Sequence, residues 1–181
     1  MLRSCWTEVE GVEASVRLSY RGANLSLSFM VREPQLRRMV TEHNSRVWED
    51  SCVEVFLKRA DREQYVNVEC SASSKMLVAK GSKRSDRTFF PLSMIESIPL
   101  RITILENNNR QSRWKAELEL DLHKLGLLED GQSPIDVPIM GNVYCCGDLH
   151  DQPHFLCAAQ IDTLDPDFHT PQFFVPFHFM S

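Results

Sequence analysis

Hydrophobic and polar residues alternate along most of the chain. Leu25, Leu27 and Phe29 are separated by serines, and between Trp114 and Leu120 every second residue is apolar while charged residues lie between. An alternation with a period of two places the apolar side chains on one face of an extended strand. The pattern therefore predicts half-buried antiparallel strands in both segments.

Similar strand-like segments recur at intervals of about ten residues, separated by turn-forming Gly, Asn and Asp residues. They cover residues 14–20, 52–57, 65–71, 76–80, 100–105, 138–145, 155–160 and 172–180. Many short strands with this spacing predict an all-β fold, an antiparallel β-sandwich of jelly-roll type. Because 181 residues suffice for one sizeable core but hardly for two, we expect residues 1–181 to form a single domain.

Helical patterns are scarce. Residues 34–43, which open at a proline, predict one short amphipathic helix, and residues 122–128 predict a further turn or two. Residues 80–94 lack alternation and carry basic residues followed by apolar ones, so we expect a long loop over the sandwich there.

The charge balance narrows the class of partner. The formal net charge is -5, from 20 basic and 25 acidic residues, which argues against a nucleic-acid partner. No segment approaches the roughly 20 apolar residues that a membrane span needs, and the first residues lack an apolar signal core. We therefore expect a cytoplasmic protein, or a secreted or periplasmic one whose leader has been removed.

The six cysteines, at positions 5, 52, 70, 145, 146 and 157, fit neither a disulfide-stapled small domain nor a zinc ribbon. Cys52 and Cys70 fall in predicted strands, where a buried thiol behaves as a small hydrophobic group. Cys145 and Cys146 are adjacent and cannot easily pair with each other. We expect most of the six to be reduced and without a catalytic role.

Residues 47–56 place polar and aromatic side chains along a predicted strand. One strand face would hold Trp48, Asp50, Cys52, Glu54 and Phe56, and the core face would hold Val53, Val55 and Leu57. Trp48 and Glu54 would lie about 20 Å apart on a fully extended chain, so they converge on one ligand only if the chain bends near Asp50. The alternative is a tryptophan at a rim, a solvated Glu54 and an Asp50 that caps a turn.

Several segments, in the right order over nearly the whole chain, resemble the family 9 carbohydrate-binding modules, in particular their stand-alone bacterial members. They are residues 47–56, Tyr65-Val66-Asn67-Val68-Glu69, Gly141-Asn142-Val143-Tyr144 running into Cys146-Gly147-Asp148, Pro153-His154-Phe155-Leu156, and Pro166-Asp167-Phe168-His169 before Pro171. The resemblance implies a jelly-roll sandwich that binds sugars without catalysis, often at the reducing end of a glycan, and that serves glycan breakdown or uptake.

In this family a sugar is held between two tryptophans by acid, amide and basic groups. Aromatic faces suit the C–H faces of a pyranose, and its hydroxyl groups need paired donors and acceptors. By this resemblance Trp48 is the first stacking tryptophan, Glu54 the carboxylate after it and Asn142 the downstream amide. Either Arg84 or Arg87 would supply the basic group.

The chain departs from the family pattern where the second tryptophan is expected, because Ala158 aligns with that position. A missing stacking partner would cost about 1 to 3 kcal/mol of binding free energy. Tyr144, Phe155 and Phe168 are the candidate replacements. The alternative function is a protein-interaction or scaffold domain that keeps the fold but has lost sugar recognition.

Two further chemistries remain open. Glu54 and Glu69 would approach each other if their strands pair, as a glycosidase requires, although we expect no enzyme activity.

His154 and His169 lie near acidic residues, but without the spacing of a transition-metal site, so the alternative is that both imidazoles tie loops to backbone carbonyls. Calcium is the expected cation if any is bound, because these loops offer oxygen ligands and the wider family includes calcium-binding members. The acids in question are Asp148 and Asp151 for the first histidine, and Asp165 and Asp167 for the second.

Overall fold

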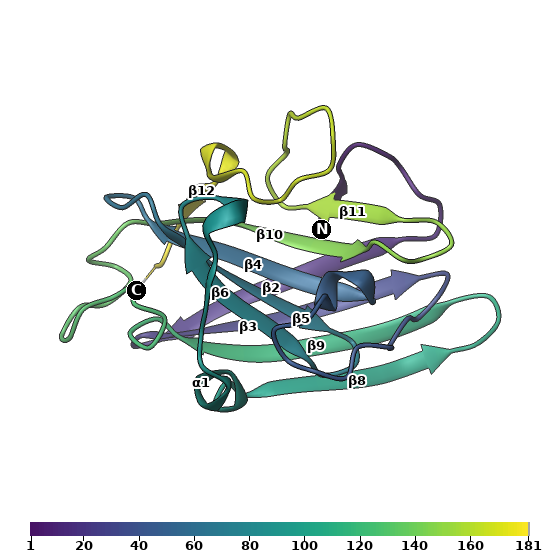
Figure 1. The fold of residues 1–181 in the computed structure, drawn as a ribbon, viewed down its shortest axis with the longest axis horizontal. Coiled ribbons are helices and arrows are strands. Elements are labelled where there is room, and N and C mark those ends of the chain that lie inside the picture. Colours follow the sequence, from purple (N-terminus) through teal and green to yellow (C-terminus); the bar gives the residue numbers. More distant parts are fainter. Residues whose placement is uncertain (181) are drawn as a thin grey trace.

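The computed structural model describes residues 1–180, which form two antiparallel β-sheets packed face to face (Figure 1). The eight-stranded sheet has the order β1-β11-β10-β4-β5-β6-β7, with β12 paired to β10, and the four-stranded sheet has the order β2-β3-β9-β8. The predicted all-β sandwich of jelly-roll type is confirmed. The larger sheet comprises β1 (Arg3–Ser4), β4 (Cys52–Arg59), β5 (Tyr65–Ser71), β6 (Met76–Gly81), β7 (Thr88–Phe89), β10 (Ile139–Gly147), β11 (His154–Cys157) and β12 (Val175–Phe177); the smaller comprises β2 (Glu13–Arg21), β3 (Asn24–Glu33), β8 (Leu100–Asn107) and β9 (Ser112–Asp121).

The main core lies between the two sheets and follows the predicted alternation. The smaller sheet contributes Phe29 of β3 and Trp114 of β9, which are both fully buried. Val53, Val55 and Leu57 of β4 join the same hydrophobic cluster from the other side. The opposite face of β4 is thereby free to carry Glu54 and Phe56 away from this core.

The predicted helix at residues 34–43 is wrong. The amides of Met39 and Val40 donate to the carboxylate of Asp50 at 2.9 to 3.0 Å, and the Arg37 amide donates to Ser51 Oγ at 3.0 Å. Tertiary partners thus take the donors that a helix would use internally.

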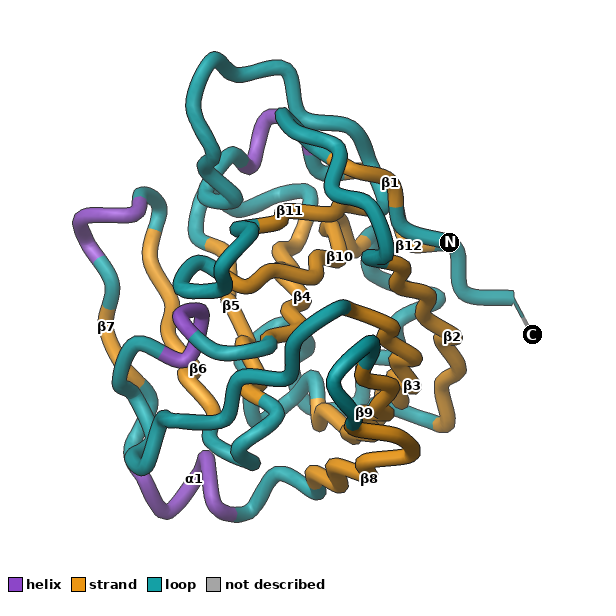
Figure 2. The backbone as a smooth tube through the Cα atoms, turned by 90° about the vertical axis from the view of Figure 1, so that its right-hand side faces the viewer, coloured by secondary structure: helices purple, strands orange, loops and turns teal. Residues whose placement is uncertain are grey.

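The helical content lies elsewhere. The α-helix is α1 (Leu92–Glu96), which overlaps the end of the expected loop and lies near the edges of β6 and β8 in Figure 2. Short 3-10 turns occur at η1 (Val47–Glu49), η2 (Arg84–Asp86) and η3 (Pro171–Phe173). Residues 122–128, where a further helical turn or two is predicted, form hydrogen-bonded turns and not a helix.

Four cysteines are free and buried, as expected for most of the six, but Cys5 and Cys157 form a disulfide. Pairing of β1 with β11 brings these two residues together across a separation of 152 residues, which no spacing rule could reveal. Within residues 1–180, no helix is long and apolar enough to cross a membrane.

Candidate ligand-binding pocket

A cavity of about 320 Å³ lies on the outer face of the larger sheet, over β4, β5 and β6. Its floor includes Glu54 and Glu69 from neighbouring strands. Its walls include Arg87 and Phe168 from loops and Phe155 from β11. The cavity therefore gathers segments that are far apart in the sequence.

Trp48 and Glu54 both line this cavity, because the chain bends between them. The turn η1 ends at Asp50, whose side chain is fully buried. Besides the amides of residues 39 and 40, the Asp50 carboxylate accepts a hydrogen bond from Ser71 Oγ at 2.7 Å. These contacts fix the bend on which the convergence of the two site residues depends.

Glu54 and Glu69 lie directly opposite each other on β4 and β5 and are 3% and 4% exposed. Burial, with repulsion from Glu69, raises the pKa of Glu54 well above its ordinary value, and burial raises the pKa of Glu69 to about 7. The Cys146 thiol donates to Glu54 at 3.1 Å, and the Asn67 amide donates to Glu69 at 2.8 Å. Near neutral pH the pair therefore holds a carboxylic acid proton, so it can both donate and accept hydrogen bonds.

Arg87 is fixed beside this carboxyl pair. Its guanidinium lies over the Tyr65 ring at 4.2 Å, and Nη2 donates to the carbonyls of Tyr65 and Ala79 and to the side chain of Asn67. Among residues 1–180, Nε and Nη1 of Arg87 and Oε2 of Glu69 are buried without a hydrogen-bonding partner. This corner of the pocket therefore has unmet hydrogen-bonding capacity.

Arg84, the other predicted basic residue, also lines the cavity but is exposed. Its Nη1 lies 3.8 Å from Oδ1 of Asp167, another wall residue. Exposed pairs of this kind contribute little free energy, so Arg84 is held far less firmly than Arg87.

Part of the cavity wall is aromatic. Phe155 and Phe168 line the cavity, whereas Ala158 is exposed and does not. The Phe168 ring is stacked on Tyr144 with 4.1 Å between centroids, and the centroid of the Trp6 ring lies 5.8 Å from that of Phe168. Two of the three candidate replacements thus reach the pocket.

Asn142 and Tyr144 do not line the cavity, in contrast to the predicted contact with the ligand. Asn142 is fully buried and exchanges hydrogen bonds of 2.8 to 2.9 Å with the backbone of Ala159. The Tyr144 hydroxyl donates to the Phe168 carbonyl at 3.3 Å. Both side chains brace the walls from behind.

His169 and Asp148 also line the cavity, although no role in ligand binding is predicted for either from the sequence. His169 Nδ1 lies 2.7 Å from the Tyr65 hydroxyl, so it ties its loop to a side chain and not to the expected backbone carbonyl. Burial lowers the pKa of His169 to about 3, so the imidazole is neutral, and burial raises the pKa of Asp148 to about 6. Both residues lie in segments that carry the family resemblance, but the residues around them come from other strands, so their roles do not follow from the motifs.

The chain matches one protein-family model and shares its fold with solved structures. The model of carbohydrate-binding family 9 matches residues 5–179. A crystal structure of a candidate carbohydrate-binding protein from Bacteroides uniformis superposes with a TM-score of 0.85 at 27% identity, covering 93% of this chain and 79% of that one. No curated protein matches the chain.

Two structures of a family 9 module from Caldicellulosiruptor kristjanssonii share the fold at 12% identity. The complex with cellotriose has a TM-score of 0.57 and covers 96% of this chain and 77% of that one. The complex with glucose has a TM-score of 0.53 and covers 97% and 82%. At this identity the likeness concerns the fold alone.

Proposed function

The chain belongs to carbohydrate-binding family 9, and from this premise we propose that its pocket binds the end of a glycan without catalysing a reaction. One observation carries the proposal: an aromatic-walled cavity has buried acid and guanidinium groups at its floor with unmet hydrogen-bonding capacity. Sugars combine apolar C–H faces with hydroxyl groups, so they match this combination. Such a module would serve glycan breakdown or uptake by holding the polymer.

The apolar wall is the stacking surface. Trp48, Phe155 and Phe168 all pack against one small buried cluster that contains Cys52 and Leu77, so they border the cavity as neighbours. Trp48 offers the largest ring and is only half-buried. We therefore assign it the main stacking contact, with the two phenylalanines in place of a second tryptophan.

The polar floor would select the ligand. The Glu54–Glu69 pair can donate and accept, and Arg87 adds donors, which together suit vicinal hydroxyl groups. A cavity of about 320 Å³ lies at the small end of the usual range for ligand pockets, about 300 to 1,000 Å³. That size favours the terminus of a glycan over a long segment laid along a groove.

The same carboxyl pair argues for binding over hydrolysis. Glycosidase carboxyls flank the scissile bond, whereas Glu54 and Glu69 project side by side from adjacent strands. We expect no turnover of aryl glycosides by the wild-type chain. Activity that disappears in Glu54→Gln would instead establish a hydrolase.

The deciding experiment is calorimetric titration with mono- and oligosaccharides, including glucose and cellotriose, with and without calcium. Trp48→Ala should weaken binding by about 1 to 3 kcal/mol, which is about 5- to 150-fold in Kd. Tyr20→Ala is the matched control, because it removes an aromatic ring from the smaller sheet.

Two outcomes would count against the proposal. Unchanged affinity in Trp48→Ala would place the site elsewhere on the chain. No heat from any sugar would favour the alternative, a scaffold domain that keeps the family fold without its ligand.

The disulfide bears on the compartment. Disulfides persist in oxidising environments and are rare in the cytosol. The Cys5–Cys157 pair thus supports a secreted or periplasmic location over the cytoplasmic one.

A further inference from the structure

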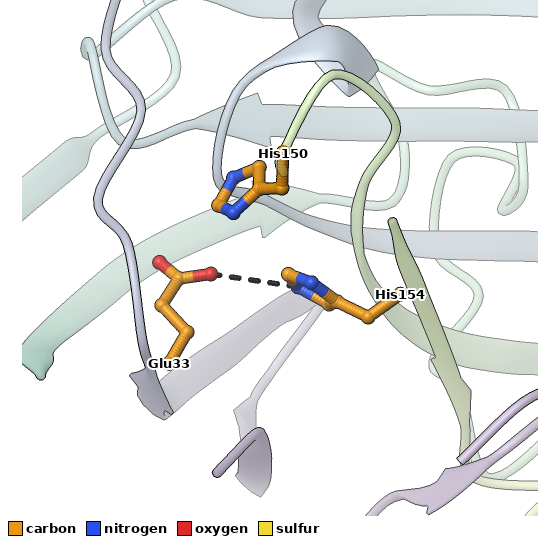
Figure 3. A group of neighbouring side chains, drawn as sticks. All are labelled: Glu33, His150 and His154. Carbon is orange, nitrogen blue, oxygen red and sulfur yellow. Dashed lines mark ion pairs between the residues drawn. The ribbon is translucent and has the colours of Figure 1, made fainter. Parts of the chain in front are cut away.

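A second group of buried polar side chains lies away from the pocket, where the two sheets meet. Glu33 ends β3 of the smaller sheet, His154 begins β11 of the larger one, and His150 lies in the loop before β11. They are 0%, 1% and 7% exposed, respectively. Figure 3 shows both imidazole rings turned toward the Glu33 carboxylate.

The hydrogen bonds within residues 1–180 leave this group unsatisfied. Glu33 Oε1 accepts from Trp114 Nε1 at 2.6 Å, but Glu33 Oε2 and both ring nitrogens of His154 have no hydrogen-bonding partner. Glu33 Oε2 lies 3.4 Å from His154 Nε2. Buried polar atoms without partners are costly, so their concentration at one point calls for an explanation.

We propose that Glu33, His150 and His154 bind a divalent transition-metal ion, with Zn²⁺ the best match. One ligand atom from each residue lies within 4.8 Å of the other two, which a small inward movement of the side chains would close around an ion. Two imidazole nitrogens and one carboxylate oxygen are a typical zinc donor set, with water as a fourth ligand. Calcium takes six to eight oxygen ligands, so this is not a calcium site.

The surroundings of the three side chains fit a metal centre. Ser51 Oγ lies 3.2 Å from Nε2 of His150, which leaves Nδ1 for the ion, and Trp114 orients the Glu33 carboxylate. Hydrogen bonds of this kind to the outer atoms of ligands are typical of metal sites. Gly147 provides the space, because a Cβ atom there would lie 2.4 Å from the His150 ring.

A simple ion pair is the competing explanation. A proton on His154 would pair that ring with Glu33 but would not engage His150. A metal ion uses one atom from each of the three residues. It would also connect the two sheets to the loop that carries Asp148 and leads to Phe155, both of which line the pocket.

The test uses the tag-free full chain after treatment with a chelator. We expect calorimetry to show one Zn²⁺ bound per chain and thermal unfolding to shift upward with added Zn²⁺, because the ion binds only the folded state. His150→Gln should weaken Zn²⁺ binding by at least about tenfold. The control His178→Gln removes an exposed imidazole and should leave the affinity unchanged.

Folding of the variants is checked by circular dichroism. His150 lies in a loop, and Glu33→Gln retains an oxygen acceptor for Trp114, so both variants should keep the sandwich. Wild-type affinity in both, or no saturable Zn²⁺ binding by the wild type, would overturn the proposal and leave an ion pair. These experiments measure Zn²⁺ binding and unfolding but not sugar binding, so their outcome is independent of the proposed function.

A cobalt spectrum locates the ion. Co²⁺ at the proposed site should show visible ligand-field bands without a thiolate charge-transfer band, because its ligands are nitrogen and oxygen. A strong thiolate band would instead place the ion at Cys52, Glu54 and Cys146, the second group of potential ligands within 4.8 Å of one another among residues 1–180. That outcome would also overturn the assignment.

Discussion

The outer faces of the two sheets differ sharply. In β3 of the smaller sheet, buried and half-exposed residues alternate along the whole strand. In β5 of the larger sheet all seven residues are buried, and in β4 only Lys58 is not. The smaller sheet thus has one solvated face, whereas the centre of the larger sheet is buried on both faces.

The second buried face of the larger sheet is not needed to form the core. An antiparallel sheet needs only one covered face to form a core, so a second covered face requires another reason. Here the cover consists of loops that enclose Glu54, Asn67 and Glu69, polar residues that are costly to bury. The region that is buried on both faces therefore lowers the stability of the fold and forms the pocket.

The largest expected effect comes from Phe56, on the outer face of β4. Its ring is fully buried against Tyr65 and Tyr144, so Phe56→Ala should lower the free energy of unfolding by about 3 to 5 kcal/mol. Met30→Ala, on the outer face of the smaller sheet, should cost at most about 1 kcal/mol, since Met30 is half-exposed and lies opposite Ser15 and Lys115. Urea unfolding measures both, and equal losses would remove the contrast between the faces.

Removal of the disulfide should have the next largest effect. The double variant Cys5→Ser, Cys157→Ser should lose about 2 to 5 kcal/mol of stability, because the bond closes a long loop. Reduction of the wild type should produce the same loss in urea unfolding. A thiol assay that finds six free cysteines in protein from native cells would contradict both the bond and the proposed compartment.

The buried carboxyl pair should make stability depend on pH. The folded-state pKa of Glu69 is about 7 against an ordinary value of 4.5, so the folded state binds more protons between these values. Its contribution to the free energy of unfolding should therefore fall by about 3 kcal/mol as the pH rises from 4.5 to 7.

Glu69→Gln tests that dependence, because the amide stays neutral at every pH. Unfolding free energies measured across this range should be flatter in Glu69→Gln than in the wild type. The control Glu119→Gln, on the exposed face of β9, should keep the wild-type slope. A wild-type slope in Glu69→Gln would show that the pair is not buried as described.

Much of the pocket could be foreseen from local sequence. Alternation in residues 47–57 separated the core face from the face of Glu54, and the resemblance to family 9 marked Trp48 and both candidate arginines. Pairing of Glu54 with Glu69 was predicted on the condition that their strands pair, and they do. The supporting roles of Asn142 and Tyr144 could not be foreseen, because a motif does not say whether a side chain faces a ligand or braces its wall.

Local sequence patterns were enough to predict the sandwich and the two faces of each strand, because side-chain direction in a strand follows from a period of two. Long-range contacts explain why residues 34–43 form no helix, why Cys5 meets Cys157, and why Glu33 meets two histidines. In each case the partner lies on a segment distant in the chain. Its position depends on how the strands are ordered and registered, which no local pattern encodes.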